Sequence, residues 1–130
     1  MLKKKVLVCI TPQTNSKRLI DKGYEVSNNG EAVLHILHVA KGKNVISQDE
    51  SVKLLHQLFI YASELGGIIH GLSGEDIYET IKKFINDELI TNIVVGEPPA
   101  EIPESDNAIT ARLKRDLPWI EVTILLRECD

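Results

Sequence analysis

A short apolar run near the start of the chain, Val-Leu-Val-Cys-Ile at residues 6–10, constrains the fold more than any other feature. It is rich in β-branched side chains and has no polar residue at alternate positions. Such a run is typical of a strand that is buried on both faces, as in a parallel sheet with a layer of helices on each side. The rest of the chain should then supply further strands and amphipathic helices in alternation.

The pattern along the chain fits this expectation. Apolar residues recur at helical spacing in segments near residues 19–27, 52–65, 77–89 and 109–113. Runs with strand character lie at residues 32–40, 68–72, 93–96 and 120–126. Strand and helix alternate four times before a closing strand, which predicts a three-layer α/β/α fold around a five-stranded parallel sheet. A length of 130 residues suits one domain, so we expect residues 1–130 to form a single unit.

Turn residues predict where individual helices begin and end. Asn28-Asn29-Gly30 should stop the first helix and Gly66-Gly67 the second, because these residues tolerate the left-handed backbone of a helix end. We expect Ser73 to cap the third helix by accepting a hydrogen bond from an amide near Asp76.

The closing strand differs from the others. Ile120, Val122, Ile124 and Leu126 alternate with Glu121, Thr123 and Leu125. Alternation indicates that one face is half exposed, as at the edge of a sheet.

Composition excludes several classes of protein. The formal net charge is −4, which argues against a general nucleic-acid binder, since those proteins normally carry a basic surplus. The two cysteines, Cys9 and Cys129, lie at opposite ends of the sequence and form neither a disulfide framework nor a zinc motif. The apolar start is too short for a signal peptide or a membrane span, so we expect a soluble, cytoplasmic protein without a metal site.

Loops at the carboxyl ends of the strands are where a parallel sheet binds ligands. Here they comprise residues 11–16, 38–41, 71–76 and 96–106. They contain neither the GxxxxGK[ST] phosphate loop nor the GxSxG nucleophile elbow, so the chain offers no catalytic set and we do not expect an enzyme.

The histidines add one candidate. His35 and His38 are three residues apart on a strand, so they should point to opposite faces and not share a metal. His38 lies near the end of that strand, where it would either contact a ligand or serve as a partly buried, hydrogen-bonded side chain; the second role is favoured. His56 should lie on a solvated helix face.

Five segments, in order along the chain, carry a resemblance to a known family. They are Val-Leu-Val-Cys-Ile-Thr-Pro at 6–12, Ser-Lys-Arg-Leu-Ile at 16–20, Leu-His-Ile-Leu-His-Val at 34–39, Leu-Ser-Gly-Glu-Asp at 72–76 and Thr-Asn-Ile-Val-Val-Gly at 91–96. Together they resemble the universal stress protein (UspA-like) family, and within it the stress-protein domain of potassium-sensing histidine kinases of the KdpD type. The resemblance implies a sheet in the order 3-2-1-4-5, as in Rossmann-like and adenine nucleotide alpha hydrolase-like folds. It also implies homodimers through the last strand, here residues 120–126.

Many members of that family bind ATP through a Gly-x₂-Gly-x₉-Gly-Ser/Thr motif after the fourth strand, with an acidic residue after the first. In this sequence Gly96 matches the first glycine and Thr110 the final hydroxyl. Pro99 and Ile109 replace the other two glycines, and Thr11 or Pro12 stands in place of the acidic residue. The motif is therefore incomplete.

The composition of the loop after Gly96 also disfavours phosphate binding. Pro98, Pro99 and Pro103 each lack an amide donor. Four carboxylates, at residues 97, 101, 104 and 106, occur with no Lys or Arg between Gly96 and Ala111. Two unit charges 4 Å apart interact by about 1 kcal/mol in water and about 4 kcal/mol at an effective dielectric near 20. Several such repulsions outweigh neutral hydrogen bonds of about 1 kcal/mol each.

We therefore expect a non-catalytic regulatory or binding module without classical ATP binding and without a cofactor, which works through dimers or a protein partner. The alternative is a sensor of ATP or a cyclic dinucleotide in stress or potassium-homeostasis signalling, as the resemblance implies. The candidate contacts for such a ligand are Thr11, Thr14, Ser16, His38, Val39, Gly96 and Thr110.

Overall fold

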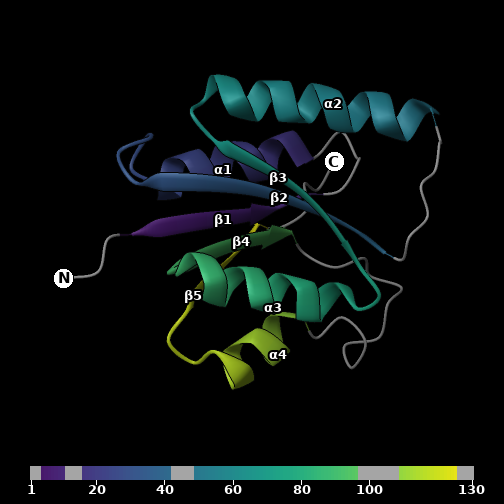
Figure 1. The fold of residues 1–130 in the computed structure, drawn as a ribbon. Coiled ribbons are helices and arrows are strands. Elements are labelled where there is room, and N and C mark those ends of the chain that lie inside the picture. The colour runs from purple at the N-terminus through teal and green to yellow at the C-terminus, as the bar shows by residue number, and fades with distance from the viewer. Residues whose placement is uncertain (1–3, 11–15, 42–48, 97–108, 126–130) are drawn as a thin grey trace.

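The computed structural model describes residues 4–10, 16–41, 49–96 and 109–125. In that part of the chain, strands and helices alternate from end to end (Figure 1). The elements are β1 (Lys5–Cys9), α1 (Ser16–Val26), β2 (Val33–Lys41), α2 (Asp49–Glu64), β3 (Ile68–Gly74), α3 (Ile77–Glu88), β4 (Asn92–Gly96), α4 (Ile109–Asp116) and β5 (Glu121–Leu125). The predicted alternation of strand and helix is confirmed.

The strands form one parallel sheet in the order β3-β2-β1-β4-β5. β1 lies at its centre, with Leu7 paired to His35 of β2 on one side and to Ile93 of β4 on the other. The predicted three-layer α/β/α fold and strand order are confirmed.

Each face of the sheet carries its own apolar core. Figure 1 shows α1 and α2 on one side of the sheet and α3 and α4 on the other. Val6 and Val8 pack in the cluster under α1 and α2, whereas Leu7 packs in the cluster under α3 and α4. All three side chains are 0% exposed. Helices on both faces are therefore the reason that β1 is apolar at every position instead of at alternate ones.

The first two helices end as predicted. Asn28 and Asn29, after α1, have φ angles of 59° and 57°, and Gly30 has a φ of 93°. Gly66, after α2, has a φ of 88°. Glycine and asparagine reach this left-handed region at low cost, which explains their use at both helix ends.

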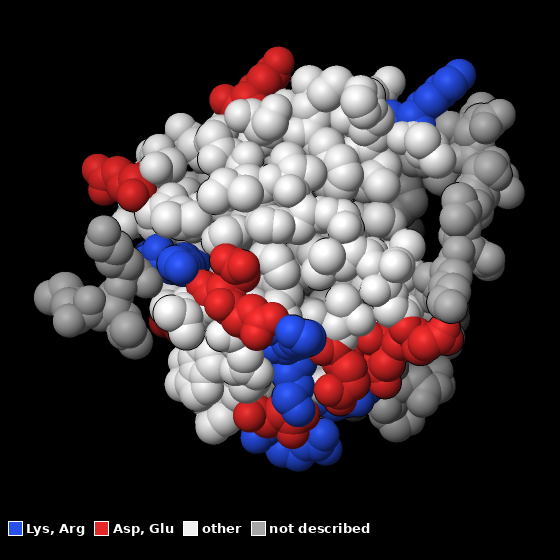
Figure 2. Space-filling model, viewed as in Figure 1, with Lys and Arg blue, Asp and Glu red and all other residues white. Residues whose placement is uncertain are grey.

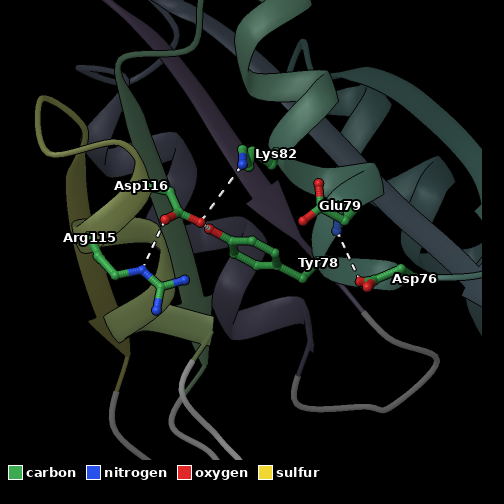
Figure 3. Close-up of polar contacts among 6 residues, drawn as sticks. All are labelled: Asp76, Tyr78, Glu79, Lys82, Arg115 and Asp116. Atoms are coloured by element: carbon green, nitrogen blue, oxygen red, sulfur yellow. Dashed lines mark hydrogen bonds and ion pairs between the residues drawn. The ribbon is translucent and has the colours of Figure 1, made fainter.

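The predicted cap of α3 is wrong. Ser73 remains in β3, where it pairs with Ala40 of β2, and the strand continues to Gly74. Asp76 caps the helix instead, with an extended backbone and a side chain that accepts a hydrogen bond from the Glu79 N–H at 3.1 Å (Figure 3). Pairing with β2 extended the strand by two residues and moved the helix start, which the local sequence did not reveal.

A polar cluster joins α3 to the end of α4 (Figure 3). The Tyr78 hydroxyl donates to Asp116 Oδ2 at 2.7 Å, and Arg115 Nε donates to Asp116 Oδ1 at 3.0 Å. These hydrogen bonds hold the pKa of Asp116 down at about 2, since they favour its charged form. Burial and the bond to Asp116 raise the pKa of Tyr78 to about 12.

β5 lies at one edge of the sheet, as predicted. Ile120 is buried just before the strand, Val122 packs against the core under α3 and α4, and Ile124 is 42% exposed. Leu126, the last residue of the predicted strand, is outside the described residues. Among the described helices, none is both long and apolar enough to cross a bilayer.

Candidate ligand-binding site

The order of the strands places the switch point of the sheet between β1 and β4, and the region outside the carboxyl ends of these two strands is named the crevice. These two strands are neighbours, yet α1 follows β1 onto one face of the sheet and α4 follows β4 onto the other. The helices that follow these adjacent strands therefore lie on opposite faces. Open α/β sheets bind ligands at this kind of switch point, outside the carboxyl ends of the strands.

Ile10 and His38 fix the β1 side of this crevice. The Ile10 N–H donates to the Leu37 carbonyl at 3.0 Å, and His38 Nδ1 lies 3.1 Å from the Ile10 carbonyl oxygen. Because a carbonyl can only accept, Nδ1 carries the hydrogen of this bond, and in the neutral ring Nε2 is an acceptor. The favoured role of His38, a half-buried and hydrogen-bonded side chain, is confirmed; its contact with a ligand stays a prediction.

Val39, the next candidate, belongs to the opposite face. It packs against the core cluster under α3 and α4, and it is half-buried. Since successive side chains of a strand point to opposite faces, a ligand on the His38 side is not lined by the Val39 side chain.

Ser16 begins α1 and is 1% exposed, so the start of this helix is packed against the domain. Lys17 and Arg18 follow it, and the first turn of α1 has no acidic residue. Cations at a helix N-terminus oppose the helix dipole and are normally avoided there. A helix N-terminus with basic residues in its first turn is a positive end that suits an anion.

These two basic residues were missed as candidates at the sequence level. Lys17 is exposed, and its ammonium lies 4.7 Å from the centre of the Tyr61 ring of α2. The signal that could have identified them is the pair of cations in the first turn of the helix that follows β1.

Gly96 ends β4 beside α1. A Cβ at this position would lie 3.7 Å from both methyl groups of Leu19, which is an ordinary contact. Packing against α1 therefore does not require a glycine here. The short distance to Leu19 shows that the end of β4 lies beside the first turns of α1.

Thr110, the remaining described candidate, is half-buried in the first turn of α4. It lies on the helix that covers the other face of the sheet from α1. Thr11, Thr14 and the acidic segment 97–108, with Pro99, lie outside the described residues.

Neither a reactive cysteine nor a group of metal ligands is found among the described residues. Burial raises the pKa of the Cys9 thiol to about 12, so this thiol is protonated and unreactive at neutral pH. In the described ranges, no three His, Cys, Asp or Glu side chains are grouped to hold a metal ion. His56 is exposed on α2, as expected.

No protein-family model and no curated protein sequence matches the chain. Solved structures do match it over 95% or more of its length. A universal stress protein from Archaeoglobus fulgidus has a TM-score of 0.69 and 15% identity, with 95% of this chain and 94% of that chain covered. A universal stress protein in complex with cAMP has a TM-score of 0.67 and 15% identity over 100% of both chains.

A universal stress protein family protein from Arabidopsis thaliana with AMP bound has a TM-score of 0.64 and 17% identity, with 98% of this chain and 94% of that chain covered. The chain therefore has the Rossmann-like fold of the universal stress proteins. At such low identity the likeness describes the fold and not the ligand.

Proposed function

We propose that this chain is a non-catalytic module of the universal stress protein type that binds an adenine nucleotide of low phosphate charge between β1 and β4. The observation that carries the proposal is the arrangement at the end of β1, where the His38–Ile10 bond lies at the same strand edge as the basic first turn of α1. Structures with the same fold hold cAMP and AMP.

His38 supplies a polar contact of the right kind. Its Nδ1–H is occupied by the Ile10 carbonyl, so a neutral His38 presents an acceptor nitrogen. Ribose hydroxyls and the exocyclic amine of adenine are donors that would pair with it. Ser16, Gly96 and Thr110, together with Thr11 and Thr14, remain the other proposed contacts.

The phosphate end of the ligand would lie toward α1. The N-terminus of α1, with Lys17 in its first turn, favours an anion there. In the sequence after Gly96, by contrast, Glu97, Glu101 and further carboxylates occur without a compensating cation. Repulsion from these carboxylates grows with the charge of the phosphate chain, so AMP and cAMP should bind in preference to ATP.

We propose a module without catalysis because the chain lacks the groups that common nucleotide chemistry requires. The sequence has no phosphate-loop lysine and no nucleophile elbow, and the Cys9 thiol is held protonated by burial. The nucleotide would then act as a signal and not as a substrate.

The cellular role is part of the same proposal. We place the module in the cytoplasm, in stress or potassium-homeostasis signalling, as a homodimer joined through β5 or bound to a protein partner. The support is the sequence resemblance to the domain of potassium-sensing kinases and the apolar side chain of Ile124, 42% exposed at the sheet edge. A cyclic dinucleotide is the second ligand to test, because it would also present phosphates to α1.

Calorimetry and thermal-shift measurements at one ionic strength test the proposal. The ligands are adenosine, AMP, cAMP, cyclic dinucleotides and ATP. Saturation at 100 times Kd should add about 2.7 kcal/mol of stability. We expect AMP or cAMP to bind more tightly than ATP, and chromatography to show no product after prolonged incubation.

The matched variants are His38→Leu in the crevice and His56→Leu on the exposed face of α2. The first should weaken nucleotide binding and the second should not, with folding of both checked by circular dichroism. No stabilisation by any nucleotide, or tightest binding of ATP, would contradict the proposal.

A further inference from the structure

A second recess lies away from the nucleotide crevice, between strand β3 and helix α3. It is an open groove of about 660 Å³. The apolar part of its lining comprises Leu72 and Phe84 together with the His70 ring, which stacks edge-on against Phe84 at 4.7 Å between centroids. Because β2 separates β3 from β1, this groove is distinct from the β1–β4 crevice.

Strand β3 forms an open edge beside the groove. Within the described residues, β2 is its single strand neighbour. Alternate residues of such a strand direct their N–H and C=O groups away from the sheet, where they can pair with another chain. Natural edges are usually protected by charged residues, prolines or bulges. The sequence of β3, Ile-Ile-His-Gly-Leu-Ser-Gly, contains no proline and no Lys, Arg, Asp or Glu.

Two exposed apolar side chains mark this edge. Ile68 is 48% exposed and Leu72 is 40% exposed. Gly71 lies between them, and a Cβ added there would meet no atom within 4 Å. Figure 2 shows a broad uncharged surface over β3 and α2, bordered below by the charged side chains along α3. The edge is therefore accessible to an incoming strand.

The rim of the groove is acidic. Its lining includes the carboxylates of Glu75, Asp76, Glu79, Asp87 and Glu88 and one cation, Lys83. Lys83 is already paired with Asp87, with 2.7 Å between Nζ and Oδ2. The groove thus has an excess of negative charge that its own residues do not balance.

Helix stability does not explain all of these carboxylates. Asp76 caps α3 and Glu79 lies in its first turn, where the helix dipole favours negative charge. Asp87 and Glu88 end the helix, where the dipole favours cations, and the last turn contains no basic residue. Asp87 is however paired with Lys83, and the Lys5 ammonium donates to the Glu88 carbonyl at 3.0 Å. Glu75 and Glu79 are the rim carboxylates without a cation among the described residues, and they complement a cation from outside the domain.

We propose that this groove docks an extended basic peptide segment of a partner protein, which adds as a strand to the free edge of β3. Every second side chain of such a peptide would point into the groove. The aliphatic stem of a Lys or Arg would lie on Leu72 and Phe84, with its charged end near Glu75 and Glu79. This docking is independent of the proposed nucleotide site.

A second copy of the chain is a poorer occupant. Its own β3 edge would bring a second acidic rim to the first, and the whole chain has a net charge of −4. Like charges brought together in an interface oppose association.

The probe is a fluorescent peptide of alternating valine and arginine, seven residues long, with blocked ends, measured by anisotropy on the full chain. The matched peptide with glutamate in place of arginine should not bind. A third peptide has the same side chains and methyl groups on all backbone nitrogens, which keeps its charge and removes its N–H donors. Equal binding of the methylated peptide would overturn strand addition.

The protein variants test the location. Glu75→Lys with Glu79→Lys reverses charge at the groove, and Glu25→Lys with Glu64→Lys makes the same net change on the exposed surfaces of α1 and α2. We expect more than about a tenfold loss of affinity for the groove pair, which is 1.4 kcal/mol, and less than about a twofold loss for the control pair. Equal losses would show attraction by net charge alone and overturn the site.

Sedimentation of the protein without peptide tests whether a second copy of the chain, and not a peptide of a partner, occupies the edge of β3. If the chain self-associates and Leu72→Lys dissociates it, the edge of β3 binds a second copy and the proposal is wrong. If Leu72→Lys has the same mass in solution as the wild-type protein, the result agrees with the proposal.

Discussion

Nδ1 of His35 lies 2.9 Å from Nε2 of His70, so two imidazoles on neighbouring strands share one hydrogen bond. Both rings also pack edge-on against Phe84 of α3. His35 is 5% exposed, and its Nε2 has no hydrogen-bond partner among the described residues. Whichever ring donates, a nitrogen of the buried ring is left unsatisfied, which costs stability.

The first prediction concerns the pH dependence that this pair confers. Burial, followed by the nearby His70 and opposed by Glu88, lowers the pKa of His35 below its ordinary value. The unfolded chain therefore binds a proton at His35 more readily than the folded one, and folding loses stability as pH falls through about 6.5. We expect the urea midpoint to fall between pH 7.5 and pH 5.5.

Two substitutions test whether His35 is the group that causes this pH dependence. His35→Leu should reduce the slope of the midpoint against pH, since it removes the titrating group. His56→Leu, on the exposed surface of α2, should leave the slope unchanged. An identical slope in the wild-type chain and His35→Leu would show that another group is responsible.

The second prediction concerns two glycines in opposite surroundings. A Cβ on Gly23 of α1 would overlap the Cγ2 of Val8 and lie 3.2 Å from Leu34 Cδ1. Alanine favours a helix over glycine by about 1 kcal/mol, but overpacking a filled core costs typically 1–3 kcal/mol. We expect Gly23→Ala to destabilise the protein in urea unfolding. Gly71→Ala, with no atom within 4 Å, should change stability by less than about 0.5 kcal/mol.

A larger loss of stability for Gly71→Ala than for Gly23→Ala would contradict the packing of α1 on β1. A stabilised Gly23→Ala would mean that helix propensity prevails because the helix can move away from Val8. Equal destabilisation at both positions would mean that the edge of β3 is covered.

The fold was predictable because its signals are local and repeated. The residues of β1 are apolar on both faces, and the alternation of strand with helix restricts the sheet to few topologies. The helix ends at Gly30 and Gly66 follow from backbone preference alone. The start of α3 depends instead on the pairing of Ser73 with Ala40, which is a tertiary contact.

The candidate site was predictable only in part, because some of its contacts depend on the pairing of strands and not on the local sequence. Alternation along β2 placed His35 and His38 on opposite faces, and the structure agrees, since His35 contacts Phe84 of α3 while His38 reaches Ile10. The hydrogen bond between His35 and His70 depends on the register of two strands 35 residues apart, which no local pattern encodes. The basic first turn of α1 was visible in the sequence, but its relation to β4 was not.

The third prediction concerns Gly96. Its position leaves room for a Cβ at 3.7 Å from Leu19, so Gly96→Ala should fold with wild-type stability. If a nucleotide approaches the backbone at the end of β4, the added methyl group should occupy part of its space and weaken binding. Calorimetry with AMP measures the second effect and urea unfolding the first. Unchanged AMP affinity would remove Gly96 from the proposed contacts.

The fourth prediction concerns the edge strand β5. Ile124 is 42% exposed, and we propose that a dimer covers it. Ile124→Lys would place a charge in that apolar contact, where desolvation is costly, and should convert the dimer to a monomer in sedimentation equilibrium. Ile60→Lys, at a position 47% exposed on α2, makes the same change in charge and apolar surface near the opposite edge of the sheet and should leave the mass unchanged. A wild-type monomer at micromolar concentration, or a dimer that survives Ile124→Lys, would exclude β5 as the interface.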